Sequence, residues 1–399
     1  MKQFRIPAVF MRGGTSKAIV FHQRDLPVDR KSWDEIFLSA IGSPDSYMRQ
    51  LDGMGGGLSS LSKICVIGPP TRPDADIDYT FAQMHITEAK VDYSINCGNM
   101  SSAMGPFAVD EGLVKVPGKE ALVRVHNTNT KKIILARFAM DDGLAAVDGD
   151  LEIPGVSGTG APVRLEFREP GGATTGKLLP TGNVVDTLEV PGVGRIRVSM
   201  VDAANAACFV NAADLGLTGI EMPEAIDASA DLMGKLERIR IAASLAMGIA
   251  KNAEEAAHKR SVPFISFVSA PQDAKMLSGD PIESNSVDLT VRMISSGQAH
   301  RALSLTVSLC TAVAARITGS VVNQRARLSA DADTPIRLAM PSGVLTVASA
   351  VSRVNGAWHA EQGVLYRTQR RLFSGQVYVR ASRVPALLAL EHSRISAAA

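Results

Sequence analysis

The sequence predicts an α+β protein made of two similar domains, each a curved, mostly antiparallel, barrel-like sheet wrapped around one buried helix. Three observations lead to this prediction. The chain has 399 residues, more than one compact core usually holds. Two helical segments, 98–108 and 300–315, are apolar on most faces, so each should lie inside a domain. The order of strands and turns that leads to the first segment recurs before the second.

The composition excludes several classes of protein. Apolar residues make up 46% of the chain and charged residues 21%, which is typical of a folded protein. The formal net charge of +2 argues against a dedicated nucleic-acid-binding protein. The N-terminus lacks the apolar run of a signal peptide, and no apolar segment is long enough to span a bilayer. We therefore expect a cytoplasmic protein that binds neither nucleic acid nor membrane.

The cysteines and histidines do not form a metal-binding pattern. The four cysteines include no CxxC pair and no zinc-like spacing to the seven histidines. In a reducing cytoplasm the cysteines should be free thiols. We expect no metal.

The first strand and its return enclose a glycine-rich loop. Ile6–Met11 is predicted as a strand, Arg12–Ser16 as the loop, and Lys17–Phe21 as the returning strand. Glycine allows the backbone to approach a ligand closely, and the loop offers N–H, hydroxyl and guanidinium donors for a carboxylate. An ordinary hairpin turn is the alternative.

A second glycine-rich loop precedes a strand that contains a lysine. Trp33–Ile41 has helical spacing and ends at Gly42. The loop Asp52–Ser60 then leads into the strand Leu61–Ile67, in which Lys63 interrupts an apolar run. A lysine in a strand usually faces solvent. If Lys63 is instead partly buried beside a cleft, it is a usable base.

The strands 78–86 and 91–95 deliver the chain to Cys97. Asn96, Gly98 and Asn99 supply turn and N-cap chemistry at the start of the first apolar helix. A thiol at a helix N-terminus meets unpaired N–H groups and the positive end of the helix dipole, which favour thiolate and bind carboxylates. Cys97 is therefore a candidate acid or base. The alternative is a free cysteine that fills the core.

The second half of the chain repeats the first. A hairpin is predicted at 122–140, folded at His126–Thr130, and a strand-like stretch follows to residue 191. The segment 198–215 then has the same order as 9–26: a strand, a turn of small residues, a returning strand and an Asp-Leu pair. The later predicted elements are a helix at 230–257, strands at 262–268 and 286–294, the helix at 300–315, and strands at 345–352, 356–365 and 375–380 that complete the second sheet.

The duplication predicts a domain boundary and a place for the active site. We expect one domain at 1–186 and another at 187–399, with a C-terminal segment that packs back on the first domain as an option. A pseudo-twofold relation would bring both helix N-termini to a cleft between the domains. The second copy offers apolar residues, around Ile265 and Leu305, near the places of Lys63 and Cys97. The acid and base should therefore come from the first domain alone.

Six motifs in order give the chain a specific family resemblance. They are Met11–Lys17, Ile41–Asp45, Asp52–Gly56, Ser62-Lys63, Asn96–Asn99 and Pro180–Asn183. Together they resemble the PrpF family of 2-methylaconitate cis–trans isomerases, which shares the diaminopimelate epimerase-like fold. Epimerases of this fold carry a catalytic cysteine on each central helix. The second helix here lacks one at the matching place, which favours the PrpF branch.

The resemblance implies roles for particular residues. Lys63 and Cys97 are implied as the acid/base pair. The implied substrate-binding residues are Arg12, Gly13, Gly14, Thr15, Ser16, Met54, Gly55, Asn96, Gly98 and Asn99 in the first domain, and Arg292, His300, Ser304 and Thr306 in the second. His300 could equally be a structural histidine.

The resemblance also implies a reaction. We expect cofactor-independent isomerisation of an unsaturated tricarboxylate, first of all 2-methylaconitate of the methylcitrate cycle in propionate catabolism. The proton would leave a carbon allylic to a carboxylate and return after the charge has spread over a dienolate. The alternatives are a 4-oxalomesaconate tautomerase, a methylitaconate Δ-isomerase, and a non-catalytic polycarboxylate-binding protein. A homodimer is an option for the assembly.

Overall fold

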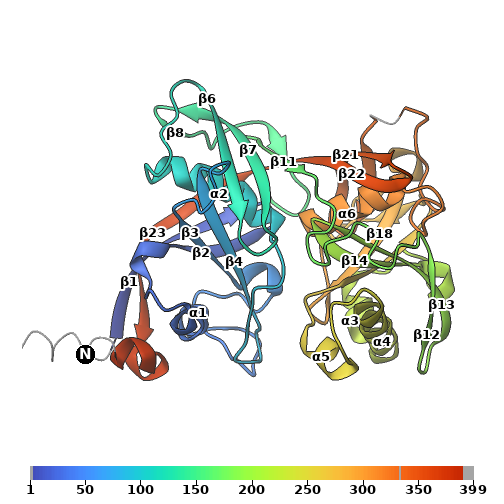
Figure 1. Cartoon of the computed structure of the whole chain (residues 1–399), viewed down its shortest axis with the longest axis horizontal. Helices are drawn as coiled ribbons and strands as arrows, with labels where there is room; N and C mark the ends of the chain where they lie inside the picture. Colours follow the sequence, from blue (N-terminus) through green and yellow to red (C-terminus); the bar gives the residue numbers. More distant parts are fainter. Residues whose placement is uncertain (1–2, 332–333, 390–399) are drawn as a thin grey trace, which may run out of the picture.

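Most strands of the molecule belong to one mixed sheet that bends around two helices (Figure 1). The structure is a computed structural model, and it describes residues 3–331 and 334–389. Within these residues, 19 strands form the sheet, so the protein is a mixed α/β structure. Figure 1 shows two lobes side by side, with helix α2 (Gly98–Asp110) in one and helix α6 (Leu305–Arg316) in the other.

The strands and remaining helices follow the chain in two sets. The first set is β1 (Gln3–Gly13), β2 (Ser16–His22), α1 (Trp33–Ile41), β3 (Lys63–Gly68), β4 (Ile77–Met84), β5 (Val91–Asp92), β6 (Glu120–Asn127), β7 (Lys132–Asp141), β8 (Leu144–Ala145), β9 (Leu151–Glu152), β10 (Thr159–Gly160) and β11 (Val163–Arg168). The second set is β12 (Asp186–Val190), β13 (Gly194–Ala203), β14 (Asn205–Asn211), α3 (Pro223–Ala228), α4 (Ala230–Ala246), α5 (Ala253–His258), β15 (Phe264–Ser269), β16 (Ala274–Lys275), β17 (Pro281–Ile282), β18 (Leu289–Ser295), β19 (Gln298–Ala299), β20 (Ile336–Met340), β21 (Gly343–Val354), β22 (Ala357–Arg367) and β23 (Gln369–Arg380).

The two sets pair their strands in the same way. In the first, β1 is antiparallel to β2, β2 parallel to β3, β3 antiparallel to β4, β4 parallel to β6, and β6 antiparallel to β7. The same alternation runs through β13, β14, β15, β18, β20 and β21 in the second. The antiparallel pair of β11 with β22 joins the two sets into one sheet.

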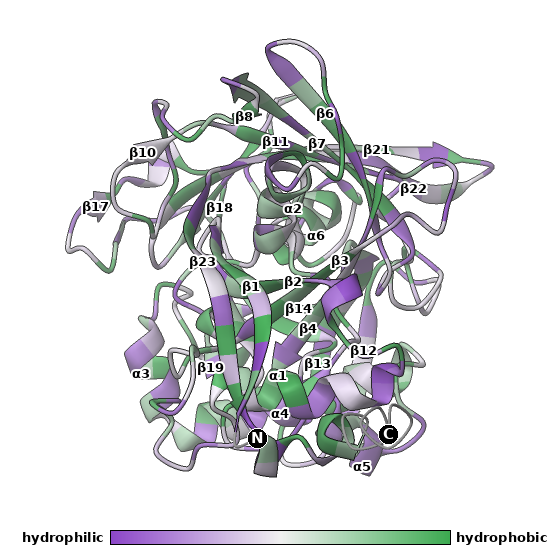
Figure 2. Ribbon diagram, turned by 90° about the vertical axis from the view of Figure 1, so that its left-hand side faces the viewer, coloured by the Kyte–Doolittle hydropathy of each residue, from purple (hydrophilic) through white to green (hydrophobic). Residues whose placement is uncertain are grey.

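The two central helices are buried, as predicted from their composition. Every residue of α2 except Asp110 is buried, and so is every residue of α6 except Arg316. Figure 2 shows both helices enclosed by strands at the middle of the molecule. Because an α-helix that is apolar on most faces has no side to present to water, the sheet must close around it.

The strands β2 and β3 are buried on both faces. Ile64 and Val66 face helix α1, where they pack with Trp33 and Phe37. Cys65 and Ile67 point to the opposite face and pack in the core around α2. Since side chains alternate along a strand, Lys63 shares the face of Cys65. This alternation directs the lysine toward α2 rather than toward solvent.

Three predictions about the second half were wrong in detail. The helix expected over 230–257 is two helices, because Gly248 adopts φ +71° after α4 and Asn252 caps α5 by accepting a hydrogen bond from Glu255 N. The helix expected from residue 300 begins at Leu305, with Ser304 as its cap. The strand expected at 375–380 does not complete the second sheet: β23 pairs with β1, and Gln3 lies opposite Arg380.

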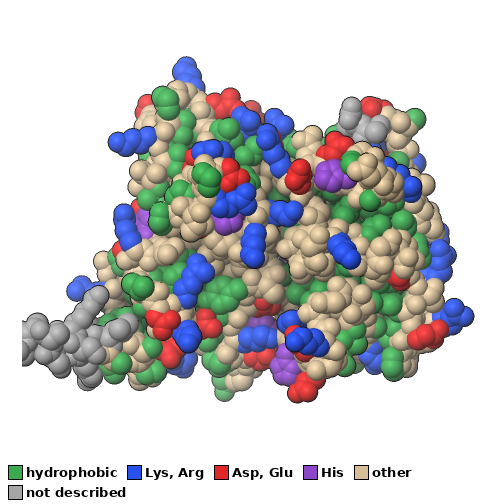
Figure 3. Space-filling view, in the orientation of Figure 1, with side chains coloured by type: hydrophobic (Ala, Val, Ile, Leu, Met, Phe, Trp, Pro, Cys, Tyr) green, Lys and Arg blue, Asp and Glu red, His purple; other side chains and the backbone are tan. Residues whose placement is uncertain are grey.

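The surface shows no segregation of charge that would mark a nucleic-acid site on the face in Figure 3, where basic and acidic side chains are interspersed. None of the helices in the described residues has the length and apolar content needed to cross a membrane.

Removing the ring of Phe107 should test how much the buried α2 contributes to stability. Phe107 is 0% exposed in the core around this helix. Phe107→Ala should lower the free energy of unfolding by about 3–5 kcal/mol, because the cavity cannot fully collapse. Phe373→Ala on β23, where the ring is 42% exposed, is the control and should cost about 1 kcal/mol or less. Equal losses in urea unfolding would contradict this assignment of the core.

Candidate active site

The N-terminal ends of α2 and α6 meet where the two halves of the molecule join. A Cβ atom on Gly98, the first residue of α2, would lie 2.6 Å from Leu305 Cδ2 and 3.1 Å from Thr306 Cγ2. Both of these residues belong to the first turn of α6. Only glycine therefore allows the two helix ends to approach this closely. The sequence-predicted residues Gly98 and Thr306 are in contact here.

A single asparagine bridges the two helix ends. Asn205, at the start of β14, donates from Nδ2 to Asn96 O (3.0 Å) and to Thr306 Oγ1 (2.8 Å), and its Oδ1 accepts from Asn96 N (3.2 Å). Asn96 Oδ1 accepts in turn from Asn127 Nδ2 at 3.0 Å. All four residues are buried. The peptide that precedes Cys97 is thus fixed from both halves of the molecule.

Cys97 occupies the N-cap position of α2 and is 8% exposed. Its side chain makes no capping hydrogen bond, so the thiol is not used to hold the helix. Burial raises the pKa of the neighbouring Cys65 thiol, and the proximity of Cys97 raises it further. The positive charge of Lys63 lowers the pKa of the same thiol. Cys65 therefore lies within the electrostatic reach of both predicted acid/base residues.

Lys63 begins strand β3 and is 7% exposed. Its Nζ donates to Gln83 Oε1 at 2.6 Å and lies 5.0 Å from the centroid of the Phe81 ring. The alternative of a solvent-facing lysine is therefore wrong. The reason is that β3 is buried on both faces, as described above.

His300 is a neutral imidazole beside Lys63. Burial, and then the positive charge of Lys63, lower the pKa of His300 to about 3. Its Nδ1 accepts from Ala302 N at 3.2 Å, which places the ring proton on Nε2. His300 can therefore donate a hydrogen bond without carrying a charge.

A cavity of about 320 Å³ lies between the two halves. Ser59, Ser60 and Leu61, which immediately precede the strand of Lys63, form part of its wall, together with Thr15. His300, Arg301 and Ala302 face them from the other half. The remaining lining residues are Leu58, Gly155, Asp227, Leu277, Gln298, Ala299 and Ser342. As far as the described residues go, the lining includes neither Lys63 nor Cys97, and both of these are buried.

The loop Arg12–Ser16 packs on the first turn of α2. A Cβ on Gly13 would lie 2.6 Å from Asn99 O, and one on Gly14, where φ is +50°, would lie 2.3 Å from Asn99 Oδ1. Thr15 Oγ1 accepts from Asn99 Nδ2 at 3.1 Å. Ser16 is buried at the start of β2. The glycines therefore serve close packing against Asn99.

Arg12 is engaged with the backbone. Its Nη1 donates to Gly14 O (3.1 Å), Thr368 O (3.0 Å) and Thr368 Oγ1 (3.0 Å). Burial and the nearby charge of Arg370 lower the pKa of Arg12. This arginine holds the loop to the start of β23.

Four sequence-predicted binding residues hold backbone elsewhere in the structure. The amides of Met54 and Gly55 donate to Ala40 O (2.9 Å) and Ile41 O (3.0 Å) at the end of α1. Arg292 donates to Glu221 O at 2.7 Å and to Val291 O at 3.0 Å, and burial lowers its pKa to about 10. Ser304 Oγ accepts from Val307 N at 3.3 Å as the cap of α6. The structure does not place these four among the residues that line the cavity.

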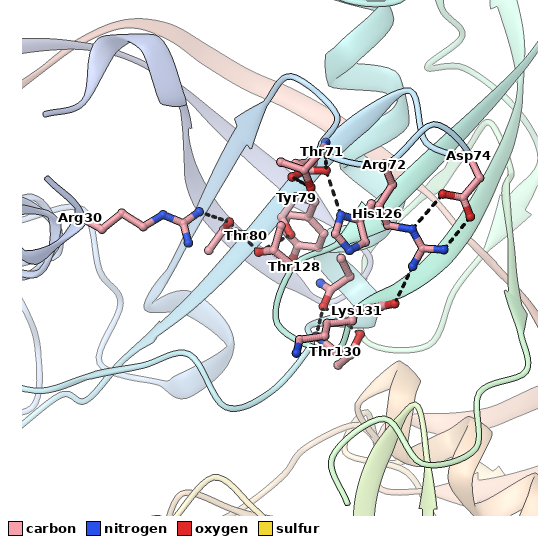
Figure 4. A network of polar contacts seen from close by, with 12 residues as sticks. Arg30, Thr71, Arg72, Asp74, Tyr79, Thr80, His126, Thr128, Thr130 and Lys131 are labelled. Atoms are coloured by element: carbon pink, nitrogen blue, oxygen red, sulfur yellow. Dashed lines mark hydrogen bonds and ion pairs between the residues drawn. The ribbon is translucent and has the colours of Figure 1, made fainter. Parts of the chain in front are cut away.

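The segment that carries the chain to Cys97 is held by the β6–β7 hairpin (Figure 4). Thr80 and Thr128 share a hydrogen bond of 2.7 Å, and His126 Nδ1 lies 2.9 Å from Asp78 Oδ1. Asn129 Nδ2 donates to Phe81 O (2.8 Å) and to Tyr93 O (2.7 Å). The hairpin turn predicted at His126–Thr130 thus ties the strand that faces Lys63 to the loop before Cys97.

Comparison with known proteins decides the family. The PrpF protein family profile matches residues 3–380. The chain belongs to the PrpF family. It is 45% identical to a 3-methylitaconate isomerase of Eubacterium barkeri over 96% of this chain and 99% of the relative. It is 38% identical to a 2-methyl-aconitate isomerase of Cupriavidus necator over 94% of this chain and 98% of the relative.

Solved structures agree with this family assignment. The crystal structure of a methylitaconate-delta-isomerase matches with a TM-score of 0.77 and 44% identity, and covers 96% of this chain and 98% of that one. A probable proline racemase from Agrobacterium radiobacter matches with a TM-score of 0.54 at 15% identity, over 93% of this chain and 92% of that one. The second match shows a shared fold alone. The protein is a PrpF-family isomerase, which confirms the resemblance stated from the motifs.

Sequence reasoning missed several residues of this PrpF-family site. Arg367, which is buried and donates from Nε to Asn99 Oδ1 at 3.0 Å, was missed. The return of a C-terminal segment to the first domain was an option, but no local signal shows which of its residues meets α2. Gln83 was also missed, because a single polar residue in a strand does not by itself indicate a functional site. Asn205 did give a signal that could have been used, since it is a lone amide in an apolar run of alanines.

Removing the Asn205 side chain should destabilise the PrpF-family fold. Asn205→Ala leaves the buried N–H and C=O of Asn96 without partners, which should lower the free energy of unfolding by about 2–4 kcal/mol. Asn183→Ala is the control, because the exposed Asn183 makes a side-chain bond only to Asp186 and to no other residue among those described. Urea unfolding measures both. A loss for Asn205→Ala no larger than the control would contradict the bridging role.

The neutral state of His300 should make the protein acid-sensitive. Below pH about 6.5 the unfolded chain takes up a proton on His300 that the folded chain refuses until pH about 3. Stability should therefore fall as the pH drops through this window, and His300→Asn should flatten that slope. His359→Asn on β22 should leave it unchanged. Urea midpoints between pH 7 and pH 4 measure the slopes, and identical slopes for His300→Asn and wild type would refute the assignment.

Proposed function

We propose that this PrpF-family isomerase moves a proton within an unsaturated polycarboxylate, without a cofactor, using Lys63 and Cys97. The observation that carries the proposal is the neighbourhood of Lys63 and Cys97. A buried amine and a helix-terminal thiol lie around Cys65 at the junction of the two halves, next to a cavity. Among the described residues, no cluster of three or more His, Cys, Asp or Glu side chains could hold a metal ion.

The chemistry needs two proton-transfer groups and fixed donors. A base removes a proton from a carbon that is both allylic and adjacent to a carboxylate. The electron pair spreads over a dienolate, and the former double bond gains single-bond character. The acid then returns a proton, either to the far end of the system, which shifts the double bond, or to the original carbon after rotation, which exchanges cis and trans. Lys63 and Cys97 supply these two roles.

The developing negative charge would have partners from both halves of the molecule. The N-terminal turn of α2 presents the positive end of its dipole. The neutral His300 offers its Nε2 proton from the other half. Because His300 is uncharged, it can donate a hydrogen bond to an enolate oxygen without also binding the carboxylate of the product through an ion pair.

Two substrates deserve the first assays. The sequence predicts 2-methylaconitate, and relatives of that name at 38% identity support it. The 45% identity to a protein named 3-methylitaconate isomerase supports a double-bond shift in 3-methylitaconate at least as well. Both reactions proceed through the same proton transfers, so the site is compatible with either. The 4-oxalomesaconate reaction is third, supported by a tautomerase of Pseudomonas putida at 35% identity.

We also propose that the two halves are pseudo-twofold copies, with a domain boundary near residues 186 and 187. The repeated alternation of strand pairs supports this, and so does the antiparallel pairing of β11 with β22. The homodimer considered from the sequence stays a prediction.

Variants of the two proton-transfer residues test the proposal. Lys63→Ala and Cys97→Ser should each lower turnover of the true substrate by about 10²–10⁴-fold, because each removes an acid or a base. Turnover is followed by proton NMR in D₂O, which also records exchange at the allylic carbon. The variant that still exchanges this proton but forms no product has lost the acid, so the experiment assigns the two roles.

Matched controls separate chemistry from folding. Lys235→Ala removes a lysine that pairs with Asp231 on helix α4, and Cys208→Ala removes a buried thiol on β14. Both should retain turnover within a few-fold. Near-normal turnover by Lys63→Ala would remove that residue from the mechanism. Absence of exchange with all three acids by the wild-type protein would refute the substrate class.

A further inference from the structure

Gln83 lies directly across the sheet from Lys63. The two residues are paired in the antiparallel register of β3 and β4, and Gln83 is 3% exposed. Its Oε1 accepts from Lys63 Nζ at 2.6 Å, a short bond typical of a charged donor. Lys63 therefore has a fixed neighbour at the nitrogen that the proposed reaction uses.

The backbone dictates which end of the Gln83 amide faces Lys63. Its Nε2 donates to Ser59 O and Ser62 O, each at 3.0 Å, and to Met84 O at 3.3 Å. Carbonyl oxygens only accept hydrogen bonds, so turning the amide over would set oxygen against oxygen at all three contacts. The amide oxygen is thus held toward Lys63. Ser59 also lines the cavity, so the same side chain fixes both the cavity wall and the amine.

Among the described residues, no group in contact with Lys63 carries a negative charge that would pin its proton. No ion pair joins Lys63 to a carboxylate within the described residues. The titratable groups that interact with it are Cys65, whose thiol pKa is raised by burial, and the neutral His300. Phe81 contributes the face of its ring. The neighbourhood also holds the thiol of Cys97, which acts on Cys65, and the phenol of Tyr79, which lies 3.8 Å from Cys65 Sγ. The carboxyl group of Asp92 lies opposite Gln83 in the register of β4 and β5, where it accepts from Ser94 N.

We propose that Gln83 is the positioning residue of the proton-transfer site: it fixes the amino group of Lys63 in place with an uncharged acceptor, so that Lys63 can both lose and regain a proton. The proposal rests on the proposed function, in which Lys63 carries a proton. A carboxylate at the same place would hold the amine equally well but would lock it as the ammonium ion. An apolar residue would leave the amine free to move, and a small displacement of a catalytic group costs rate steeply.

Two substitutions of Gln83 should move the titration of Lys63 in opposite directions. Gln83→Glu places a negative charge beside Lys63 Nζ, which favours the protonated amine and should shift the pH profile of Lys63 acylation to higher pH. Gln83→Met keeps the size but removes the acceptor, which disfavours the protonated amine and should shift this profile to lower pH. The reactivity of Lys63 toward acetic anhydride between pH 6 and 11, read by peptide mass spectrometry, measures this titration without any substrate.

Gln50→Met is the matched control. Gln50 is also a buried glutamine of the first half, and it bonds to Ser43, Gly57 and Ser62 but not to Lys63. Its loss should reduce stability and leave the titration of Lys63 unchanged. Circular dichroism checks that each variant is folded, and the two Gln83 variants provide independent readings if one of them is not.

The second measurement is the catalytic activity of the same variants on the unsaturated acid that the wild-type protein converts. Gln83→Met should lower kcat by about 10–100-fold with KM changed less than about threefold, and the pH at half-maximal kcat should move with the Lys63 titration. A role in folding alone would lower kcat without moving the pH profile. An unchanged Lys63 titration in both Gln83 variants overturns the proposal. If the wild-type protein converts no acid, the proposed function fails, while the labelling still decides whether Gln83 controls Lys63.

Discussion

The close contact between the N-terminal ends of α2 and α6 is the constraint on which the rest of the structure depends. Gly98 makes it sterically feasible, and Asn205 makes it specific by bonding to Asn96 and Thr306 at once. Each central helix is enclosed by the strands of its own half, so neither could reach the other except at its end. The cavity is lined by residues of both halves, and Thr15 on its wall accepts from Asn99 in the first turn of α2.

The polar groups around that junction are mostly neutral. His300 is held uncharged by burial and by Lys63, Gln83 is an amide, and the bridging residues are asparagines and a threonine. A buried lysine without a carboxylate partner is costly to fold, since its charge is not compensated in place. This cost would be offset if an anionic substrate, as in the proposed function, paired with the charge of Lys63.

The sequence allowed the two central helices, the positions of several strands of the first half and the Cys97 turn to be predicted, because each has a local signal: apolar composition, alternation, or asparagine and glycine at a turn. Other features depend on long-range pairing and have no such signal. The pairing of β23 with β1 joins residues at opposite ends of the chain and sets Thr368 beside Arg12. The pairing of β22 with β11 ends at Arg367, which bonds to Asn99. The glycines of the Arg12–Ser16 loop looked like ligand-binding positions, yet their close contact is with Asn99.

The register of the strands also shows which residues of the second half occupy the places of Lys63 and Cys97. Lys63 pairs with its parallel neighbour Ala18 as Phe264 pairs with Ala207, so Phe264 holds the place of the lysine. Cys97 and Ser304 are the N-cap residues of α2 and α6. The matching residues thus lie one position before the Ile265 and Leu305 expected from the sequence. A phenyl ring and a hydroxyl do not titrate near neutral pH. In the proposed function, proton transfer would therefore be confined to the first half, while the second half supplies the neutral His300 and the opposite wall of the cavity.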